Sequence, residues 1–191
     1  MLDQLVLQHR YAALRPQSHP VITAWHGSPY SFHVFSRKNT ALTGEGGAAY
    51  GAGIYFTTNR SVAEYYRDLT KSTTATLYHA RLHVDRSRLM DWNTTVAEQP
   101  VHVRKILDNV IDWDWEQYPS PPARHLYHFV RATYRAGGAD AVAATYEASR
   151  WLSRAGIQGI VYLGDIEGKS VSRPVNYVIF NAQSIEITQI I

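Results

Sequence analysis

The segment 50–57, Tyr-Gly-Ala-Gly-Ile-Tyr-Phe-Thr, constrains the fold most, because two glycines stand directly before an aromatic, β-prone run. Glycine inside a strand usually marks a bulge or the close approach of another backbone. An earlier apolar run, 21–25, ends at a His-Gly-Ser tripeptide (26–28), where glycine again removes the Cβ that would keep a ligand from the backbone. We therefore expect two strands, one ending in His26 and one carrying Tyr55, that form a cleft suited to a flat polar ring.

The next segment, 59–69, predicts a helix that faces the aromatic strand. Thr58 or Asn59 provides the N-cap side chain. Large apolar and aromatic side chains then recur at i, i+3, i+4 and i+7, the spacing of one helical face: Val62, Tyr65, Tyr66 and Leu69. We expect this face to point at the strand with Tyr55, so that Tyr66 lies opposite Tyr55 with a planar group between them.

Strand and helix signals along the rest of the chain favour an α+β fold. An alternating pattern predicts a strand over 76–84, and helical periodicity runs from about 98 to 155. Within that helical part, Gly137-Gly138 ends one helix and Asp140 caps the next. Three β-prone runs follow, at 157–163, 175–180 and 185–191. Strands that flank a helical insert indicate α+β architecture rather than alternating β-α-β units.

Composition is typical of a single globular domain. The chain has 191 residues, of which 45% are hydrophobic and 18% charged. We expect one domain over 1–191, with 1–20 as an N-terminal extension and 21–191 as the core. No apolar run approaches the length of a membrane span, and the N-terminus lacks the features of a secretory signal. We therefore expect no membrane partner and action in the cytoplasm of the producing or a target cell.

Charge and cysteine content limit the kinds of site and partner that the chain can have. The absence of cysteine excludes disulfides, cysteine nucleophiles and thiolate metal sites. The histidines show no metal-ligand spacing, so we expect no metal. The net charge is +3, and the basic residues gather in clusters. Such clusters favour an ordinary solvated surface and leave nucleic acid open as a partner.

Three motifs, in this order, resemble the ADP-ribosyltransferases of the diphtheria-toxin and poly(ADP-ribose) polymerase branch. That branch carries a His, a Tyr and usually a Glu on three core strands. The motifs are His-Gly-Ser at 26–28, Tyr-Gly-Ala-Gly-Ile-Tyr-Phe at 50–56 and Ala-Glu-Tyr-Tyr at 63–66. Further stretches look like the domains of polyvalent phage proteins and of bacterial toxins and effectors: 43–46, 90–92 with 98–99, and 156–163 leading to 176–181.

The resemblance, which runs from about Ala24 to the C-terminus, implies a split antiparallel β-sheet core with helices inserted between the strands. It also implies a site for NAD as co-substrate. His26 would contact a ribose hydroxyl, and the backbone of Gly27 would hold the nicotinamide carboxamide. Ser28 would add a hydroxyl contact or hydrogen-bond within its own turn. Tyr55 and Tyr66 would sandwich the nicotinamide ring, the alternative being two packed core tyrosines.

The chain departs from the family pattern on the third strand, where Asn176 stands in place of the usual catalytic Glu. An amide can hold a ribose hydroxyl but cannot supply the negative charge that stabilises a sugar cation. We expect Glu45, which lies between two glycines, to supply that carboxylate. Asp165 and Glu167 are the alternatives.

The resemblance implies an NAD-dependent ADP-ribosyltransferase, a bacterial or phage toxin or defence enzyme that modifies a macromolecule. The basic clusters favour RNA slightly over protein as the acceptor. A toxin or effector of this kind implies a cognate antitoxin or immunity protein as a further partner. Two alternatives remain. One is a toxin that mainly hydrolyses NAD. The other is a non-enzymatic NAD-binding or interaction module, which the Asn at position 176 favours.

Overall fold

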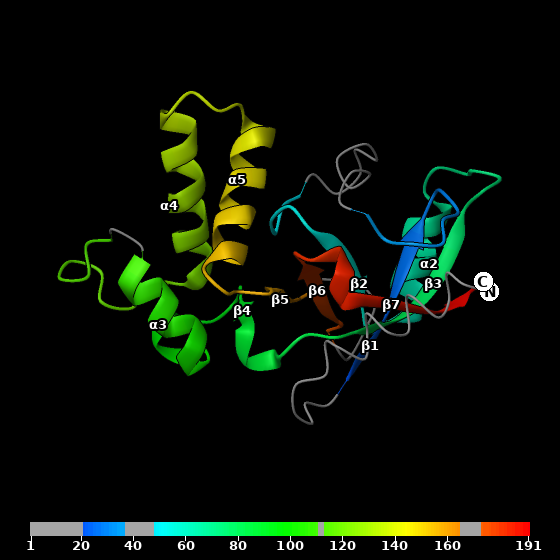
Figure 1. Ribbon diagram of the computed structural model, residues 1–191, viewed down its shortest axis with the longest axis horizontal. Helices are drawn as coiled ribbons and strands as arrows, with labels where there is room; N and C mark the ends of the chain where they lie inside the picture. The colour runs from blue at the N-terminus through cyan, green and yellow to red at the C-terminus, as the bar shows by residue number, and fades with distance from the viewer. Residues whose placement is uncertain (1–20, 37–47, 111–112, 165–172) are drawn as a thin grey trace.

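The computed structural model describes residues 21–36, 48–110, 113–164 and 173–191, and these form an α+β fold (Figure 1). The predicted α+β class is confirmed. The strands are β1 (Ile22–Ser28), β2 (Ile54–Thr57), β3 (Thr76–Leu82), β4 (Leu89–Asp91), β5 (Gly159–Leu163), β6 (Val175–Ile179) and β7 (Ile185–Ile190). The α-helices are α2 (Arg60–Asp68), α3 (Val101–Val110), α4 (Ala123–Ala136) and α5 (Ala141–Arg154). Short 3₁₀ turns lie at Arg86–Arg88, Val96–Glu98 and Ala182–Ser184.

The strands form one seven-stranded sheet in the order β4-β5-β6-β2-β1-β3-β7. All neighbours are antiparallel except β4 and β5. Helices α3, α4 and α5 follow β4 and precede β5 along the chain, and they stand together on one side of the ribbon (Figure 1). The expected extension at 1–20 lies outside the described residues. No helix in the described part of the chain is long and apolar enough to cross a bilayer.

Local capping fixes the helix ends as the sequence predicts. Asn59 begins α2, and its side-chain oxygen accepts a hydrogen bond from the backbone N–H of Ser61 at 2.9 Å. Asp140 begins α5, and its carboxylate accepts from the N–H of Ala143 at 2.8 Å. Helix α4 ends at Gly137, and the following Gly138 has a φ of 96°. Each of these boundaries depends on neighbouring residues only.

The inward face of α2 differs from the predicted one. Ala63 is its buried residue, at 1% exposure, whereas Tyr65 is 63% and Tyr66 47% exposed. The reason lies in Gly27 of β1, because a Cβ at that position would collide with the carbonyl oxygen of Ala63. The helix therefore packs backbone against backbone through its smallest face, and the tyrosines lie to the side. The hydrophobic periodicity of the sequence gives no sign of such a close contact between two backbones.

Strand β2 begins at Ile54, so Gly51 and Gly53, which were expected inside a strand, lie before it. The residues before it form a turn, in which the N–H of Gly51 donates to the carbonyl of Ala48 at 2.9 Å and Gly51 has a φ of 105°. Gly53 marks the close approach that strand glycines predict. A Cβ there would lie 2.6 Å from Cγ1 of Val178 on the neighbouring β6.

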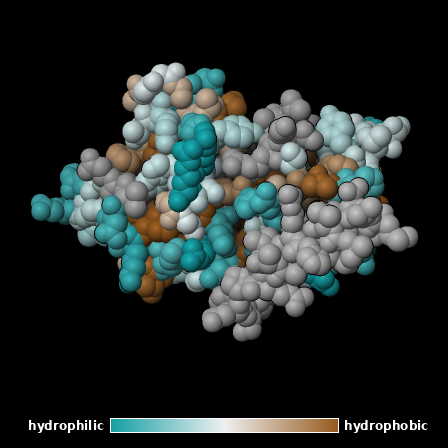
Figure 2. Space-filling view, in the orientation of Figure 1, coloured by the Kyte–Doolittle hydropathy of each residue, from teal (hydrophilic) through white to brown (hydrophobic). Residues whose placement is uncertain are grey.

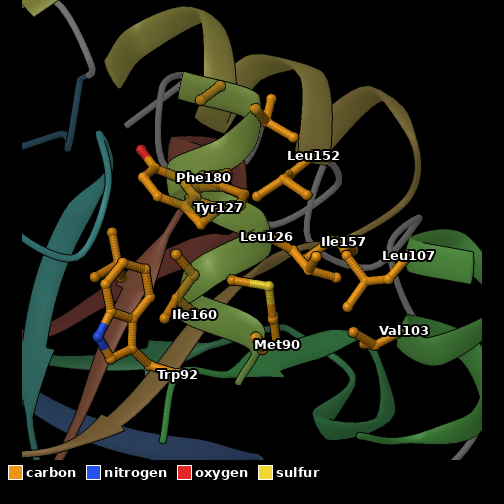
Figure 3. Packing of buried hydrophobic residues seen from close by; sticks show 14 of the residues in the cluster. Met90, Trp92, Val103, Leu107, Leu126, Tyr127, Leu152, Ile157, Ile160 and Phe180 are labelled. Atoms are coloured by element: carbon orange, nitrogen blue, oxygen red, sulfur yellow. The ribbon is translucent and has the colours of Figure 1, made fainter. Parts of the chain in front are cut away.

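Two hydrophobic clusters hold the sheet. The first joins α3, α4 and α5 to β5 and β6 (Figure 3); its members include Leu126, Tyr127, Leu152, Ile160 and Phe180. The second lies around β1, β3 and β6, and its members include Ile22, Phe35, Phe56, Tyr78 and Tyr177. Burial of these side chains supplies the main stabilising term for both parts of the fold.

Helix α2 and the helical insert lie over the same face of the sheet. Gly27, two residues after Trp25, contacts α2. Val178, two residues after Asn176, packs in the helical cluster. Trp25 pairs with Thr57, and Thr57 pairs with Asn176. Since directly paired residues and residues two apart share a face, both helical units flank this row of residues.

Candidate functional site

The sheet nearly separates between β1 and β2. Strand β1 pairs with β3 along its whole length, but a single residue pair, Trp25 with Thr57, joins β1 to β2. Just beyond that pair, Nδ1 of His26 donates to the carbonyl oxygen of Tyr55 at 2.7 Å. A side chain therefore satisfies the backbone acceptor where the strand ladder stops. This opening is the candidate site.

His26 is a neutral imidazole with a defined tautomer. Its partner is a carbonyl, which can only accept, so Nδ1 carries the proton. Burial lowers the pKa of His26 below its ordinary value of 6.5. Its ring lies among aromatic rings, with centroids 5.1 Å from Phe35 and 5.5 Å from Phe56. At neutral pH, Nε2 is thus an acceptor, suited to a ligand hydroxyl.

The backbone of Gly27 points into the opening. Leu77 of β3 is opposite Gly27, and its N–H and C=O both bond to Ile191, at 2.9 Å each. The N–H and C=O of a strand residue point to the same side, so Leu77 and Gly27 form a non-hydrogen-bonded pair. The N–H and C=O of Gly27 therefore face β2, at a level where β1 and β2 no longer pair.

Ser28 is engaged in its own turn. Its hydroxyl oxygen accepts from the N–H of Tyr30 at 3.1 Å, and the residue is 5% exposed. This geometry matches the local hydrogen bond that was one of its two predicted roles.

A polar row crosses the sheet beside the opening. The strand register sets Thr57 opposite Asn176 and Asn176 opposite Tyr162. Asn176 is 7% exposed, and its Oδ1 is buried without a hydrogen-bond partner among the described residues. Gly164 leaves room for this amide, because a Cβ there would collide with Nδ2 of Asn176. An orphaned buried acceptor is costly unless a ligand or water satisfies it.

Tyrosines surround this row. The hydroxyl of Tyr55 donates to the carbonyl of Gly51 at 2.8 Å and accepts from the N–H of Tyr50 at 3.3 Å. The ring of Tyr50 stacks on that of Tyr162 at 3.7 Å and 10°. Burial raises the pKa of Tyr55 and of Tyr162, and the phenol of Tyr66 raises that of Tyr162 further. Tyr55 and Tyr162 are therefore neutral hydrogen-bonding groups at neutral pH.

Tyr66 lies near this group without stacking on Tyr55. Within the described residues its ring contact is with Tyr65, at 5.6 Å between centroids. Its phenol contributes to the raised pKa of Tyr162, which indicates that the two side chains are near one another. A planar group between Tyr55 and Tyr66 remains a prediction.

The helical insert holds the turn that carries Tyr55. The N–H of Ala52 donates to Oγ of Ser149 at 2.8 Å. The Ser149 hydroxyl lies 3.0 Å from the hydroxyl of Tyr127, which donates to the carbonyl of Thr145 at 3.1 Å. Ser149 is fully buried. This polar chain ties α4 and α5 to the edge of the site.

Sequence reasoning identified some site residues and missed others. It assigned roles to His26, Gly27, Tyr55 and Asn176, which belong to the neighbouring strands β1, β2 and β6. Glu45, Asp165 and Glu167 lie outside the described residues. Thr57, Tyr162 and Ser149 received no role, because only the strand register and the helix packing bring them to the site. No cluster of three or more His, Cys, Asp or Glu side chains that could hold a metal occurs in the described part of the chain.

Comparison with protein-family models, with curated proteins and with solved structures gave no match. The case for a function therefore depends on the site itself. Its central feature is that His26, Tyr55 and Asn176, from segments far apart in the chain, lie on the neighbouring strands β1, β2 and β6. Tyr55 and Asn176 share a face with Gly27. The His26 ring lies on the opposite face, near Phe35 and Phe56, and meets the opening through its bond to the Tyr55 carbonyl.

Proposed function

We propose that this protein is an NAD-dependent ADP-ribosyltransferase, with the split-sheet core of that fold. The observation that carries the proposal is the position of His26, Tyr55 and Asn176 on adjacent strands, at the point where the sheet opens. Of the motifs that resemble the family, 26–28 lies on β1, 50–56 leads into β2, and 63–66 lies in α2, while the further stretch 176–181 includes most of β6. The donors and acceptors around the opening suit the carboxamide of a flat polar ring and ribose hydroxyls.

The nicotinamide and the ribose hydroxyls of NAD have candidate partners at the opening. The N–H and C=O of Gly27 face the opening and would pair with the nicotinamide carboxamide. Nε2 of His26 would accept from one ribose hydroxyl. The unpartnered Oδ1 of Asn176 would accept from another. Tyr66, 47% exposed, would cover the ring.

The chemistry requires a charge that these groups lack. When the bond between ribose C1′ and nicotinamide breaks, the electron pair leaves with the ring nitrogen and positive charge builds on the sugar. A carboxylate stabilises that charge or accepts the proton of the incoming nucleophile. Asn176 is uncharged, and His26 and Tyr55 are neutral. Glu45 is our candidate for this role, followed by Asp165 and Glu167.

The acceptor separates this proposal from its alternatives. Water as acceptor would make the protein an NAD glycohydrolase. The Asn at the usual Glu position favours, as a second candidate, a module that binds NAD without turning it over. As a transferase, the protein would act on a macromolecule in the cytoplasm as a toxin or effector, countered by an antitoxin or immunity protein.

The test is incubation of the purified protein with NAD labelled in its adenylate half and with whole-cell extract, followed by nuclease or protease. Macromolecule-bound label with release of nicotinamide supports the transferase. Free ADP-ribose alone would mean hydrolysis. Unchanged NAD, together with calorimetric binding, would mean the binding module. Absence of both binding and turnover would refute the NAD site.

A further inference from the structure

Helix α4 carries a stripe of basic side chains. Arg124, His128, Arg131 and Arg135 recur at i, i+4, i+7 and i+11, one line along about 16 Å of helix. The helix contains no acidic residue. Its buried side, with Leu126, Tyr127 and Val130, packs in the helical cluster and leaves the stripe at the flank.

Within the described residues, no salt bridge engages the arginines of this α4 stripe. Burial lowers the pKa of His128, and the neighbours that lower it further are all basic: Arg131, His125 and Arg124. Carboxylates on the adjoining α5 are engaged elsewhere. Glu147 pairs with Arg150 at 3.4 Å, and the carboxylate of Asp140 caps its own helix. The space-filling view shows hydrophilic side chains over the helical region, with apolar ones between them (Figure 2).

The stripe connects to the candidate site through a run of aromatic rings. The ring of His128 lies 5.3 Å from that of Trp92, and Trp92 lies 5.4 Å from Tyr50. Tyr50 in turn stacks on Tyr162, which is opposite Asn176 in the sheet. Trp92 is buried, at 6% exposure, whereas Tyr50 and Tyr162 are half-buried. Basic groups near partly exposed aromatic rings are the combination that binds single strands, phosphates on the cations and bases on the rings.

We propose that the α4 stripe binds the phosphate backbone of a nucleic-acid strand, and that nucleic acid is the acceptor at the candidate site. The acceptor half of this inference depends on the proposed transferase function. A nucleophilic oxygen or nitrogen of the strand would bond to ribose C1′ as the C1′–nicotinamide bond breaks. Nicotinamide would leave with the bonding electrons, and the proton of the nucleophile would pass to the catalytic carboxylate.

The binding test compares two variants of equal charge change in the full chain. The stripe variant is R124Q/R131Q/R135Q, and the matched control replaces exposed cations elsewhere, K71Q/K105Q/R154Q. Fluorescence anisotropy with a labelled single-stranded RNA and the equivalent DNA gives the affinity over a series of salt concentrations. Thermal melting shows that both variants are folded.

We expect the stripe variant to bind at least about tenfold more weakly than the control, with a log–log salt slope shallower by about 2, since each phosphate contact to a single strand contributes about 0.7. The RNA and DNA arms identify which strand is preferred. Equal loss in both variants, or no binding by the unmodified protein, would overturn the inference.

The two proposals fail differently. If NAD label is transferred to protease-sensitive material and the stripe binds no nucleic acid, the transferase stands and nucleic acid as acceptor is wrong. If the stripe binds nucleic acid and calorimetry finds no NAD binding, the transferase is wrong and the binding surface stands.

Discussion

The two sides of the candidate site are built by different means. On the side of β1, helix α2 approaches Gly27 so closely that no side chain fits between the two backbones. On the side of the helical insert, a buried polar chain from Ala52 through Ser149 to Tyr127 holds the turn before β2. On the first side, the absence of a side chain at Gly27 lets the helix come close. On the second side, hydrogen bonds hold the turn in place. The first should fail abruptly when an atom is added, and the second gradually when a bond is removed.

The largest effect is expected at Glu45, the candidate catalytic carboxylate. E45Q should lower the transfer rate by about 10²–10³, because it keeps the shape of the side chain and removes only the charge. NAD affinity in calorimetry should change little. N176A should lower the transfer rate less than E45Q does. N176E should keep transfer activity if position 176 has the geometry of the usual catalytic Glu. Full transfer activity in E45Q would move the role to Asp165 or Glu167.

The side of β1 is tested by G27A, which should lower the free energy of unfolding by about 3 kcal/mol, because the added Cβ meets the helix backbone at Ala63. Urea denaturation measures the loss. G137A is the control, since a Cβ there would lie 3.4 Å from its nearest neighbour, and we expect a change within about 0.5 kcal/mol. Similar values for the two variants would mean that α2 does not need the glycine.

The helical side is tested by S149A, which leaves the N–H of Ala52 and the hydroxyl of Tyr127 with one partner fewer. A buried unsatisfied group costs about 1–3 kcal/mol, and urea denaturation should show a loss in this range. S153A, one turn later on α5, is the matched control. A stability equal to that of the control would show that packing alone holds the turn.

The exposed ring beside the site is tested by Y66A, which should weaken NAD binding by about 1–3 kcal/mol through the loss of one stacking face. The neighbouring Y65A removes a ring of the same kind, 63% exposed, and should leave the calorimetric affinity unchanged. H26A should act like Y66A through a lost ribose hydrogen bond. Equal affinities for Y65A and Y66A would contradict the sandwich.

The smallest effect concerns pH. Because burial lowers the pKa of His26 in the folded state below 6.5, the unfolded chain binds the proton first as pH falls. The contribution of His26 to stability is therefore complete above pH 6.5 and declines below it. H26N keeps a donor for the Tyr55 carbonyl and removes the titration, so its stability should fall less between neutral and mildly acidic pH. Parallel urea-denaturation curves across that range would contradict this assignment.

The sequence predicts well those parts of the fold that local chemistry decides. Asn59, Asp140 and Gly137 end or begin helices through bonds to their own neighbours. Strand β4 received no prediction, because it has three residues and exists through pairing with the distant β5. The face of α2 was wrong for a similar reason: Gly27, far away in sequence, decides it.

The same limit applies to the site. Motifs drew attention to His26, Tyr55 and Asn176 one segment at a time. The row of Thr57, Asn176 and Tyr162 depends on strand register, which no short window of sequence contains. The tie from Ser149 to Ala52 spans 97 positions, and a serine inside a helix gives no sign of it.

Because only the pair of Trp25 with Thr57 joins β1 to β2, the sheet consists of two parts that are connected at one point. A molecule that bonds to Gly27 in one part and to Asn176 in the other would connect the two parts a second time. Its binding energy would then add to the cohesion of the whole domain, in proportion to RT ln(1 + [L]/Kd). Amide exchange should slow in β3 and in β5 together when such a molecule is bound, because each strand belongs to one of the two parts of the sheet that it joins.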